Sequence, residues 1–343
     1  IVGGDQMQKE VFDPLKNGIA DYAGWFFVLT VNFFMIFILV IGFSKFGKIR
    51  LGGNDARPEF STVAWFSMLF SAGMGIGIIF YSVAEPMYHY MQPPMGTSET
   101  MDSAQTAMNF TFLHWGLHAW AIYALVALAL AFFCFNRGLP LSIRSLFHPI
   151  FGTRVYGLWG DLIDILAVLS TLFGLATSLG IGVTQINSGL GYLFGTGDKL
   201  AILPEGSEIM ASGTLVEILL IVGITTIATL SVVSGIDKGV KFLSEQNIRI
   251  GALLMLFVII VGPTLFIFDS LVQNMGSYIA SVVELGFWTE SFQEEAHRGD
   301  NWQNYWTVFY WSWWIAWSPF VGTFIARVSK GRTIREFVFG VLL

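Results

Sequence analysis

The sequence predicts an all-α integral membrane protein, and three observations lead to that class. Hydrophobic residues make up 54% of the 343 residues, charged residues only 12%, and the mean hydropathy is +0.65. A soluble protein could not cover its surface with so few charges. Apolar runs long enough to cross a bilayer recur along the chain, and basic residues cluster after every second run. These features together indicate helices that cross a membrane several times.

Seven apolar spans can be read in order, each near or above the length of about 20 residues that a bilayer-crossing helix needs. A transmembrane domain is therefore predicted over residues 22–343, after an extracellular segment at 1–21. A shorter apolar stretch at 277–287 is predicted to be an interfacial helix in the outer leaflet. Because the chain begins at Ile1 and stops inside an apolar run, both ends are expected to be cut from a longer protein. The predicted spans cover approximately residues 22–44, 61–90, 104–135, 161–192, 214–233, 249–272 and 302–327.

Basic residues set the orientation of these spans. Lysines and arginines follow the first, third, fifth and seventh spans, and the positive-inside rule makes those regions cytoplasmic. The amino end of the chain is then outside and the carboxyl end is cytoplasmic. The basic residues on the opposite side are Lys9, Lys16, Lys199 and Arg298.

Glycine-rich stretches interrupt two spans. In the second span, Gly73, Gly75 and Gly77 alternate with other residues, and each glycine costs about 0.8 to 1 kcal/mol relative to alanine inside a helix. Residues spaced by two cannot share one helix face, so a broken helix explains them better than close helix packing. Unwound backbone is tolerated at membrane depth where it faces a cavity, an ion or neighbouring protein. In the fourth span, residues 178–182 form a milder run for which a break and tight packing both remain open.

The seventh span is unusually rich in tryptophan. Packing alone rarely uses many indoles, because each one brings an N–H group that needs a partner. An interfacial belt would place the rings at the two ends of the span, whereas these rings crowd its middle. They therefore indicate a surface made of aromatic faces. The indoles are Trp306, Trp311, Trp313, Trp314 and Trp317.

A second aromatic face lies in the third span, where three rings fall within about 80° of one another on a helix of 3.6 residues per turn. Two such faces opposed across a bundle would form a box. A box of rings binds a cation that cannot donate hydrogen bonds, typically a quaternary ammonium, and each desolvated ring contributes about 2 kcal/mol or less. We expect micromolar to millimolar affinity, which suits a carrier that must release its cargo. The two faces consist of Trp115, Trp120 and Tyr123, and of Trp313, Trp314 and Trp317.

Few charged side chains lie inside the spans. Glu85 precedes Pro86 and is expected to have a structural role at a helix end rather than to carry protons. His114 and His118 lie one turn apart, but no carboxylate or cysteine nearby in sequence completes a metal site, so structural hydrogen bonds are expected. The net charge of -6 argues against nucleic acid as a partner. No phosphate loop, Ser-His-Asp order or paired carboxylates stand out, so the chain is not predicted to be an enzyme and no catalytic residue is assigned.

These residues resemble the betaine/choline/carnitine transporter family, from about Gly18 to the end of the chain. The resemblance implies a leucine-transporter-like inverted-repeat fold, with the seven spans standing for the second to eighth of twelve helices. It further implies a homotrimer in the bacterial inner membrane that imports an osmoprotectant by alternating access. The matching motifs are Gly73-Met-Gly-Ile-Gly77 with Ala84-Glu-Pro86, His114-Trp-Gly-Leu-His-Ala-Trp-Ala-Ile-Tyr123, Ser178-Leu-Gly-Ile-Gly-Val-Thr-Gln185 and Trp311-Ser-Trp-Trp-Ile-Ala-Trp-Ser-Pro-Phe-Val-Gly322.

The resemblance also implies roles for single residues. Trp115, Trp120, Tyr123 and Trp314 would hold a trimethylammonium group, with Trp313 and Trp317 beside them. Sodium, the only cofactor-like component expected, would bind near Ser71 and Met74, and again near Thr171 and Phe320. Sodium-coupled relatives would be expected to carry a hydroxyl one turn after Thr171, where this chain has Leu175. The substrate pathway would include Phe309, Gly73, Gly75 and Gly77.

Gly77 bears on the choice of substrate, because choline carriers of the family tend to have an acid at this position. Glycine betaine, or dimethylsulfoniopropionate, is therefore favoured over choline. Carnitine, choline and ectoine remain alternatives, as do proton coupling and exchange. A seven-helix receptor is the alternative from another class, but the apolar run after Glu336 indicates further membrane segments and the last span has no lysine for retinal. A channel would need a polar pore lining.

Overall fold

The computed structural model describes residues 7–73, 75–194, 214–292 and 301–342, and within these ranges the chain is helical without named strands. The all-α prediction is confirmed for this part of the chain. Three backbone hydrogen bonds of 2.8–2.9 Å join the segment around Leu51 to the one around Arg332, and an isolated β-bridge pairs Arg50 with Thr333. The α-helices are α2 (Asp13–Phe43), α3 (Thr62–Gly73), α4 (Ile76–Met91), α5 (Met101–Trp115), α6 (Leu117–Ala131), α7 (His148–Phe151), α8 (Leu158–Leu193), α9 (Thr214–Val233), α10 (Lys241–Val261), α11 (Thr264–Phe287), α12 (Phe309–Val328) and α13 (Ile334–Leu342).

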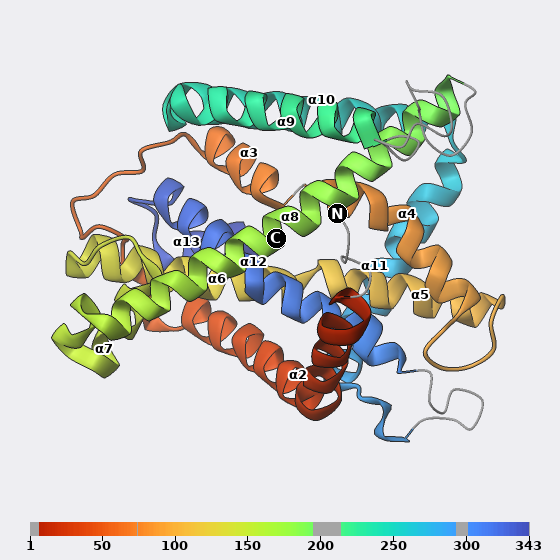
Figure 1. Cartoon of the computed structure of the whole chain (residues 1–343), viewed down its shortest axis with the longest axis horizontal. Helices are drawn as coiled ribbons and strands as arrows, with labels where there is room; N and C mark the ends of the chain where they lie inside the picture. The colour runs from red at the N-terminus through yellow and green to blue at the C-terminus, as the bar shows by residue number, and fades with distance from the viewer. Residues whose placement is uncertain (1–6, 74, 195–213, 293–300, 343) are drawn as a thin grey trace.

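Short π and 3-10 turns extend or connect these helices. The π-turns are η1 (Gln8–Phe12), η3 (Phe132–Asn136), η6 (Ile236–Val240) and η9 (Asn304–Val308), and the 3-10 turns are η2 (Lys45–Lys48), η4 (Ile143–Phe147), η5 (Gly152–Tyr156) and η7 (Glu290–Phe292). In Figure 1, α9 and α10 lie along one edge of the molecule and α2 lies along the opposite edge, with α6 and α12 between them.

Five helices of the described chain are long and apolar enough to cross a membrane, or six if the bent pair α3 and α4 forms one span. They correspond to the first six predicted spans. The seventh predicted span is helical as α12 and is not among the five. Its indoles and tyrosine carry polar N–H and O–H groups, so the segment is less hydrophobic than an aliphatic one of equal length.

Three predicted boundaries differ from the structure. The predicted border between residues 21 and 22 falls inside α2, which runs unbroken through it. The predicted sixth span, 249–272, is interrupted at Gly262 and Pro263, so α10 ends earlier than predicted. Pro263 has no N–H group to continue the helical hydrogen bonds. The predicted interfacial helix at 277–287 is then only the second half of α11, a helix of 24 residues.

The predicted break in the second span is present. Helix α3 ends at Gly73, Gly75 is extended with φ -92° and ψ 175°, and α4 begins at residue 76 with its axis bent by 57° from α3. The milder run at 178–182 does not interrupt α8, which is continuous through it. A further break at Gly116 separates α5 from α6, and the hydroxyl of Tyr278 accepts a hydrogen bond of 3.3 Å from the freed N–H of Leu117.

The buried core lies where α6 and α12 pack along each other. A Cβ atom added at Gly322 of α12 would lie 2.8 Å from Val126 and 3.3 Å from the backbone of Ala127, so this glycine lets the two helices approach closely. Helix α2 packs on α6 from one side, and α8 contacts α12 from another. The aromatic residues of α12 are thereby held at the centre of the molecule, next to the break between α3 and α4.

Candidate functional site

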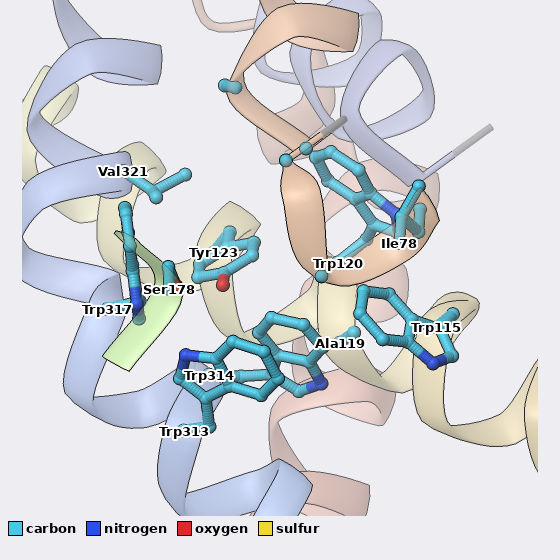
Figure 2. Close-up of a pocket in the computed structure, with 14 residues that line it drawn as sticks. Ile78, Trp115, Ala119, Trp120, Tyr123, Ser178, Trp313, Trp314, Trp317 and Val321 are labelled. Carbon is cyan, nitrogen blue, oxygen red and sulfur yellow. The ribbon is translucent and has the colours of Figure 1, made fainter. Parts of the chain in front are cut away.

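A cavity lies between the broken helix and the aromatic residues of α6 and α12. The open space between its walls is about 600 Å³, counting space that is continuous with solvent. Figure 2 shows rings from the α5–α6 segment facing rings from α12 across this space. The structure therefore brings together the two aromatic faces that the sequence predicts. The lining residues are Ala72, Gly73, Gly75, Gly77, Ile78, Trp115, Ala119, Trp120, Tyr123, Ser178, Trp313, Trp314, Trp317 and Val321.

Trp314 is the ring on which the other aromatics converge. The ring of Trp115 approaches it edge to face at 4.9 Å between centroids, and Tyr123 does so at 6.0 Å. Trp313 stacks parallel to it at 4.9 Å with an interplanar angle of 11°. Its own Nε1 donates a hydrogen bond of 3.0 Å to the carbonyl of His114, so this indole is satisfied without a ligand. Edge-to-face contacts of this kind hold the rings at fixed angles.

The glycines of the broken helix lie directly against these rings. A Cβ atom added at Gly73 would be 2.1 Å from the Trp120 ring, so only glycine permits this approach. A Cβ atom added at Gly77 would lie 3.0 Å from Trp313 and 3.3 Å from Trp115, which is tight but nearly accommodated. Gly77 thus sits between the two aromatic faces, where a longer side chain would enter the cavity.

The indole N–H groups of Trp313 and Trp317 are buried and have no partner within the part of the chain that the structure describes. Both residues line the cavity. An unpartnered buried N–H costs free energy unless a ligand or water satisfies it. A Cβ atom added at Gly174 would lie 2.7 Å from Nε1 of Trp317, so this N–H group is packed against α8, and the residue offers its ring to the cavity.

One known protein family matches nearly the whole chain. The sequence model of the BCCT, the betaine/carnitine/choline family of transporters, matches residues 2–343. The chain belongs to this transporter family. Its relatives are transporters and not enzymes, in agreement with the sequence prediction. Members of this bacterial family cross the membrane several times, and the apolar helices of this chain agree with that.

Several curated members of the family are similar over most of this chain. The glycine betaine transporter of Acinetobacter baylyi is 46% identical over 96% of the chain and 47% of its own length. The glycine betaine transporter OpuD of Bacillus subtilis is 46% identical over 100% of the chain and 64% of its own length. The high-affinity choline transport protein of Escherichia coli is 45% identical over 93% of the chain and 45% of its own length. The chain thus spans about half to two thirds of the length of these transporters.

The described residues that the family resemblance assigns to sodium lie outside the lining of the cavity. Ser71 stands one turn before the break and is joined to α10 by two long hydrogen bonds of 3.4 Å, with Ser244 and Asn247. Met74 lies outside the described residues. Thr171 donates to the carbonyl of Ala167 within α8 at 2.9 Å. None of the described members of the set lines the cavity itself.

Thr171 and Phe320 belong to helices that touch at this level of the transporter. The neighbouring Ser170 donates a hydrogen bond of 2.9 Å to the carbonyl of Ala316, which joins α8 to α12. Phe320 is half exposed and packs on Trp317 at 5.5 Å. Phe309, expected in the pathway, does not line the cavity and instead contacts Trp313 at 5.7 Å.

Sequence reasoning missed the importance of Glu85. It was expected at a helix end, but it lies within α4, six residues before the end at Met91, and its side chain is fully buried. His114 hydrogen-bonds to Glu85, whereas His118 bonds to Asn32 at 3.1 Å, so the two histidines belong to different networks and do not form a metal pair. Glutamate is rare within membrane spans, and that rarity was the available signal.

Proposed function

We propose that this protein is a secondary active transporter that imports glycine betaine by alternating access. The supporting observation is the pair of opposed aromatic faces around the cavity, converging on Trp314. A trimethylammonium group has no N–H hydrogen to donate, so it needs no hydrogen-bond acceptor. Aromatic ring faces can therefore replace its hydration without a carboxylate. No acidic side chain lines the cavity among the described residues, which favours a zwitterion over a net cation. The similarity to glycine betaine transporters points the same way.

The fold that we propose is the leucine-transporter-like inverted repeat, with the helices of this chain forming the second to eighth of twelve. The break between α3 and α4 at the cavity supports it, because such carriers place substrate and ions at unwound helix segments near the bilayer midplane. We further propose a homotrimer in the bacterial inner membrane, with the amino end of this chain outside and the carboxyl end cytoplasmic. The distribution of lysine and arginine after alternate spans supports that orientation.

Sodium is the coupling ion that we propose, near Ser71 and Met74 and near Thr171 and Phe320. The contact of α8 with α12 at Ser170 brings the second pair of segments together. One charge moving through about 100 mV releases about 2.3 kcal/mol, which corresponds to nearly fifty-fold accumulation of substrate. Leu175 stands where a hydroxyl ligand would be expected, so proton coupling and exchange are the competing mechanisms to test.

Radiolabelled uptake into proteoliposomes tests the proposal. Glycine betaine, choline, carnitine, ectoine and dimethylsulfoniopropionate would each be measured with an imposed sodium gradient, with potassium in its place, and with a proton gradient alone. We expect glycine betaine to accumulate only with the sodium gradient. Equal uptake in all three conditions would contradict sodium coupling, and uptake of choline in preference to glycine betaine would contradict the substrate assignment.

A further inference from the structure

The carboxylate of Glu85 is the centre of a buried hydrogen-bond network directly behind the aromatic cavity. Its Oε1 atom lies 2.6 Å from His114 Nδ1 and 3.1 Å from His89 Nε2. Its Oε2 atom accepts hydrogen bonds of 2.7 Å from Trp115 Nε1 and 2.6 Å from the Tyr310 hydroxyl. None of these atoms is part of the proposed ion sites. Two oxygens of a carboxylate offer about four acceptor positions, so the acceptor capacity of Glu85 is filled.

This network connects both walls of the cavity. Trp115, at the end of α5, lines the cavity and meets Trp314 edge to face. Tyr310, in α12, stacks on Trp314 at 5.9 Å with an interplanar angle of 26° and on Trp313 at 6.2 Å with 21°. One carboxylate oxygen therefore fixes a ring on each side, from helices that are far apart in sequence. Glu85 itself does not line the cavity.

His114 anchors the same arrangement a second time. Its side chain holds Glu85 and, through Nε2, lies 3.0 Å from the hydroxyl of Thr307. Its main-chain carbonyl accepts the hydrogen bond from Trp314 Nε1 at 3.0 Å. The orientation of Glu85 and the position of Trp314 are thus set by one residue. Buried networks of this kind rigidify a core, and the atom of this one without a partner among the described residues is His89 Nδ1.

A metal ion is the competing explanation of the cluster, because ligand atoms of Glu85, His89 and His114 lie within 4.8 Å of one another. Two ligands of a tetrahedral zinc ion, each about 2.0 Å from the metal, are separated by about 3.3 Å. The separation of 2.6 Å between Glu85 Oε1 and His114 Nδ1 is instead that of a charge-assisted hydrogen bond. The geometry therefore favours a hydrogen-bonded network over a metal centre.

We propose that Glu85 is a positioning residue for the aromatic cavity. This assignment rests on the proposed function. Glu85 holds Trp115 and Tyr310 at the angles at which the rings around Trp314 accept a trimethylammonium group. Without the carboxylate, the N–H of Trp115 loses its partner and the ring turns to satisfy it elsewhere. The loss then falls on substrate affinity, because the ring faces no longer converge.

The test is the affinity and transport rate of the variant Glu85→Gln in the purified transporter. Glutamine keeps the shape, but Trp115 and Tyr310 then meet either its NH2 group, which cannot accept, or a neutral amide oxygen, which accepts more weakly than a carboxylate. We expect the KM for glycine betaine uptake, and the Kd from tryptophan fluorescence, to rise about tenfold, which corresponds to one lost buried hydrogen bond. The maximal rate should stay within about twofold of the wild type. Ser329→Ala is the matched control, because it removes the buried acceptor of another indole, that of Trp65 at 3.0 Å, while neither residue bonds to Glu85 or lines the cavity; its KM should stay unchanged.

The split between KM and maximal rate separates positioning from general stability. A merely structural role would lower the maximal rate through loss of folded protein and leave KM and Kd unchanged, which would overturn the proposal. Tyr310→Phe keeps the stacked ring and removes one donor, and its KM should rise about threefold, a weaker form of the same loss. If Glu85→Gln does not fold, Tyr310→Phe becomes the deciding variant, and an unchanged KM in that variant overturns the proposal. Absence of glycine betaine binding by the wild type would instead overturn the proposed function, and this assignment with it.

Discussion

The α5–α6 segment, on which α12 packs, and the α8–α10 segments have similarly apolar sequences but differ in how much of that surface is buried. In the most apolar 18-residue window of Met101–Asn136, 56% of the residues are buried, whereas in the corresponding windows of Leu158–Leu193, Thr214–Val233 and Lys238–Val261 only 6% are. The first region carries small residues and rings, which let helices approach and interlock. The second carries large aliphatic residues that point outward, such as Leu219 and Leu254. Similar hydropathy thus accompanies very different burial within the described chain.

The largest effect that follows is at Trp314, the centre of the buried region. Trp314→Leu should abolish measurable glycine betaine uptake in proteoliposomes, because three neighbouring rings lose the face on which they converge. Trp25→Leu is the matched control, since Trp25 is 62% exposed on α2. Near-normal uptake by Trp314→Leu would break the proposed distinction between site rings and surface rings.

A methyl group added to the buried region should be far more harmful than one added outside it. In Gly73→Ala the new Cβ would collide with Trp120, and we expect uptake to fall about tenfold or more, since displacing a packed ring costs about 1–3 kcal/mol. Gly223→Ala in α9 meets no atom within 4 Å and should keep its uptake. Equal losses in both variants would show that helix propensity matters more than the cavity.

Selectivity should respond at Gly77, where the broken helix touches both ring faces. Gly77→Asp places a carboxylate between Trp115 and Trp313, and its charge should attract a net cation and repel the carboxylate of a betaine. We expect the ratio of choline to glycine betaine uptake to rise about tenfold, equivalent to about 1.4 kcal/mol. Competition of each solute against labelled glycine betaine measures it. An unchanged ratio would remove the reason for favouring a zwitterion.

Stability should follow burial in the same way. Ile122→Ala removes a side chain that is 1% exposed in α6, and the cavity that it leaves costs about 2–5 kcal/mol. Leu254→Ala removes one that is 55% exposed on α10 and should cost less than about 0.5 kcal/mol. Thermal unfolding in detergent compares the two. A larger loss for Leu254→Ala would indicate that α10 packs against protein on its outward face.

The smallest effect is expected outside the membrane, at the far end of α12. Burial alone would raise the pKa of Glu59, but hydrogen bonds and charges from Arg327 and Lys330 hold that pKa below its ordinary value. Because the folded pKa is lowered, the contribution to stability is present at neutral pH and is lost as the pH falls through that pKa. Glu59→Gln should therefore cost less than about 1 kcal/mol at neutral pH. Thermal unfolding at neutral and acidic pH should show the difference between variant and wild type disappearing in acid.

Most of the fold class and much of the cavity could be predicted from the sequence. Apolar spans, their alternating charges and the glycine break are local patterns, read within one helix at a time. The two sets of three aromatic residues were predicted in the same way, and all of them line one cavity. The predicted sixth span, 249–272, was wrong at its end because the prediction followed hydropathy alone. Pro263 interrupts the helix there. The second break, at Gly116, was not predicted because a single glycine within a helical pattern is weak evidence.

The sequence by itself determined a helical membrane chain with two aromatic faces and one broken span. Only the tertiary structure decided that Trp314 is where the rings converge, that Tyr278 satisfies the backbone at the second break, and that Glu85 lies behind the cavity rather than at a helix end. The physical reason is the range of the interactions. Helix periodicity relates residues three or four positions apart, whereas Glu85 and Tyr310 are separated by 225 positions and meet only when the helices pack.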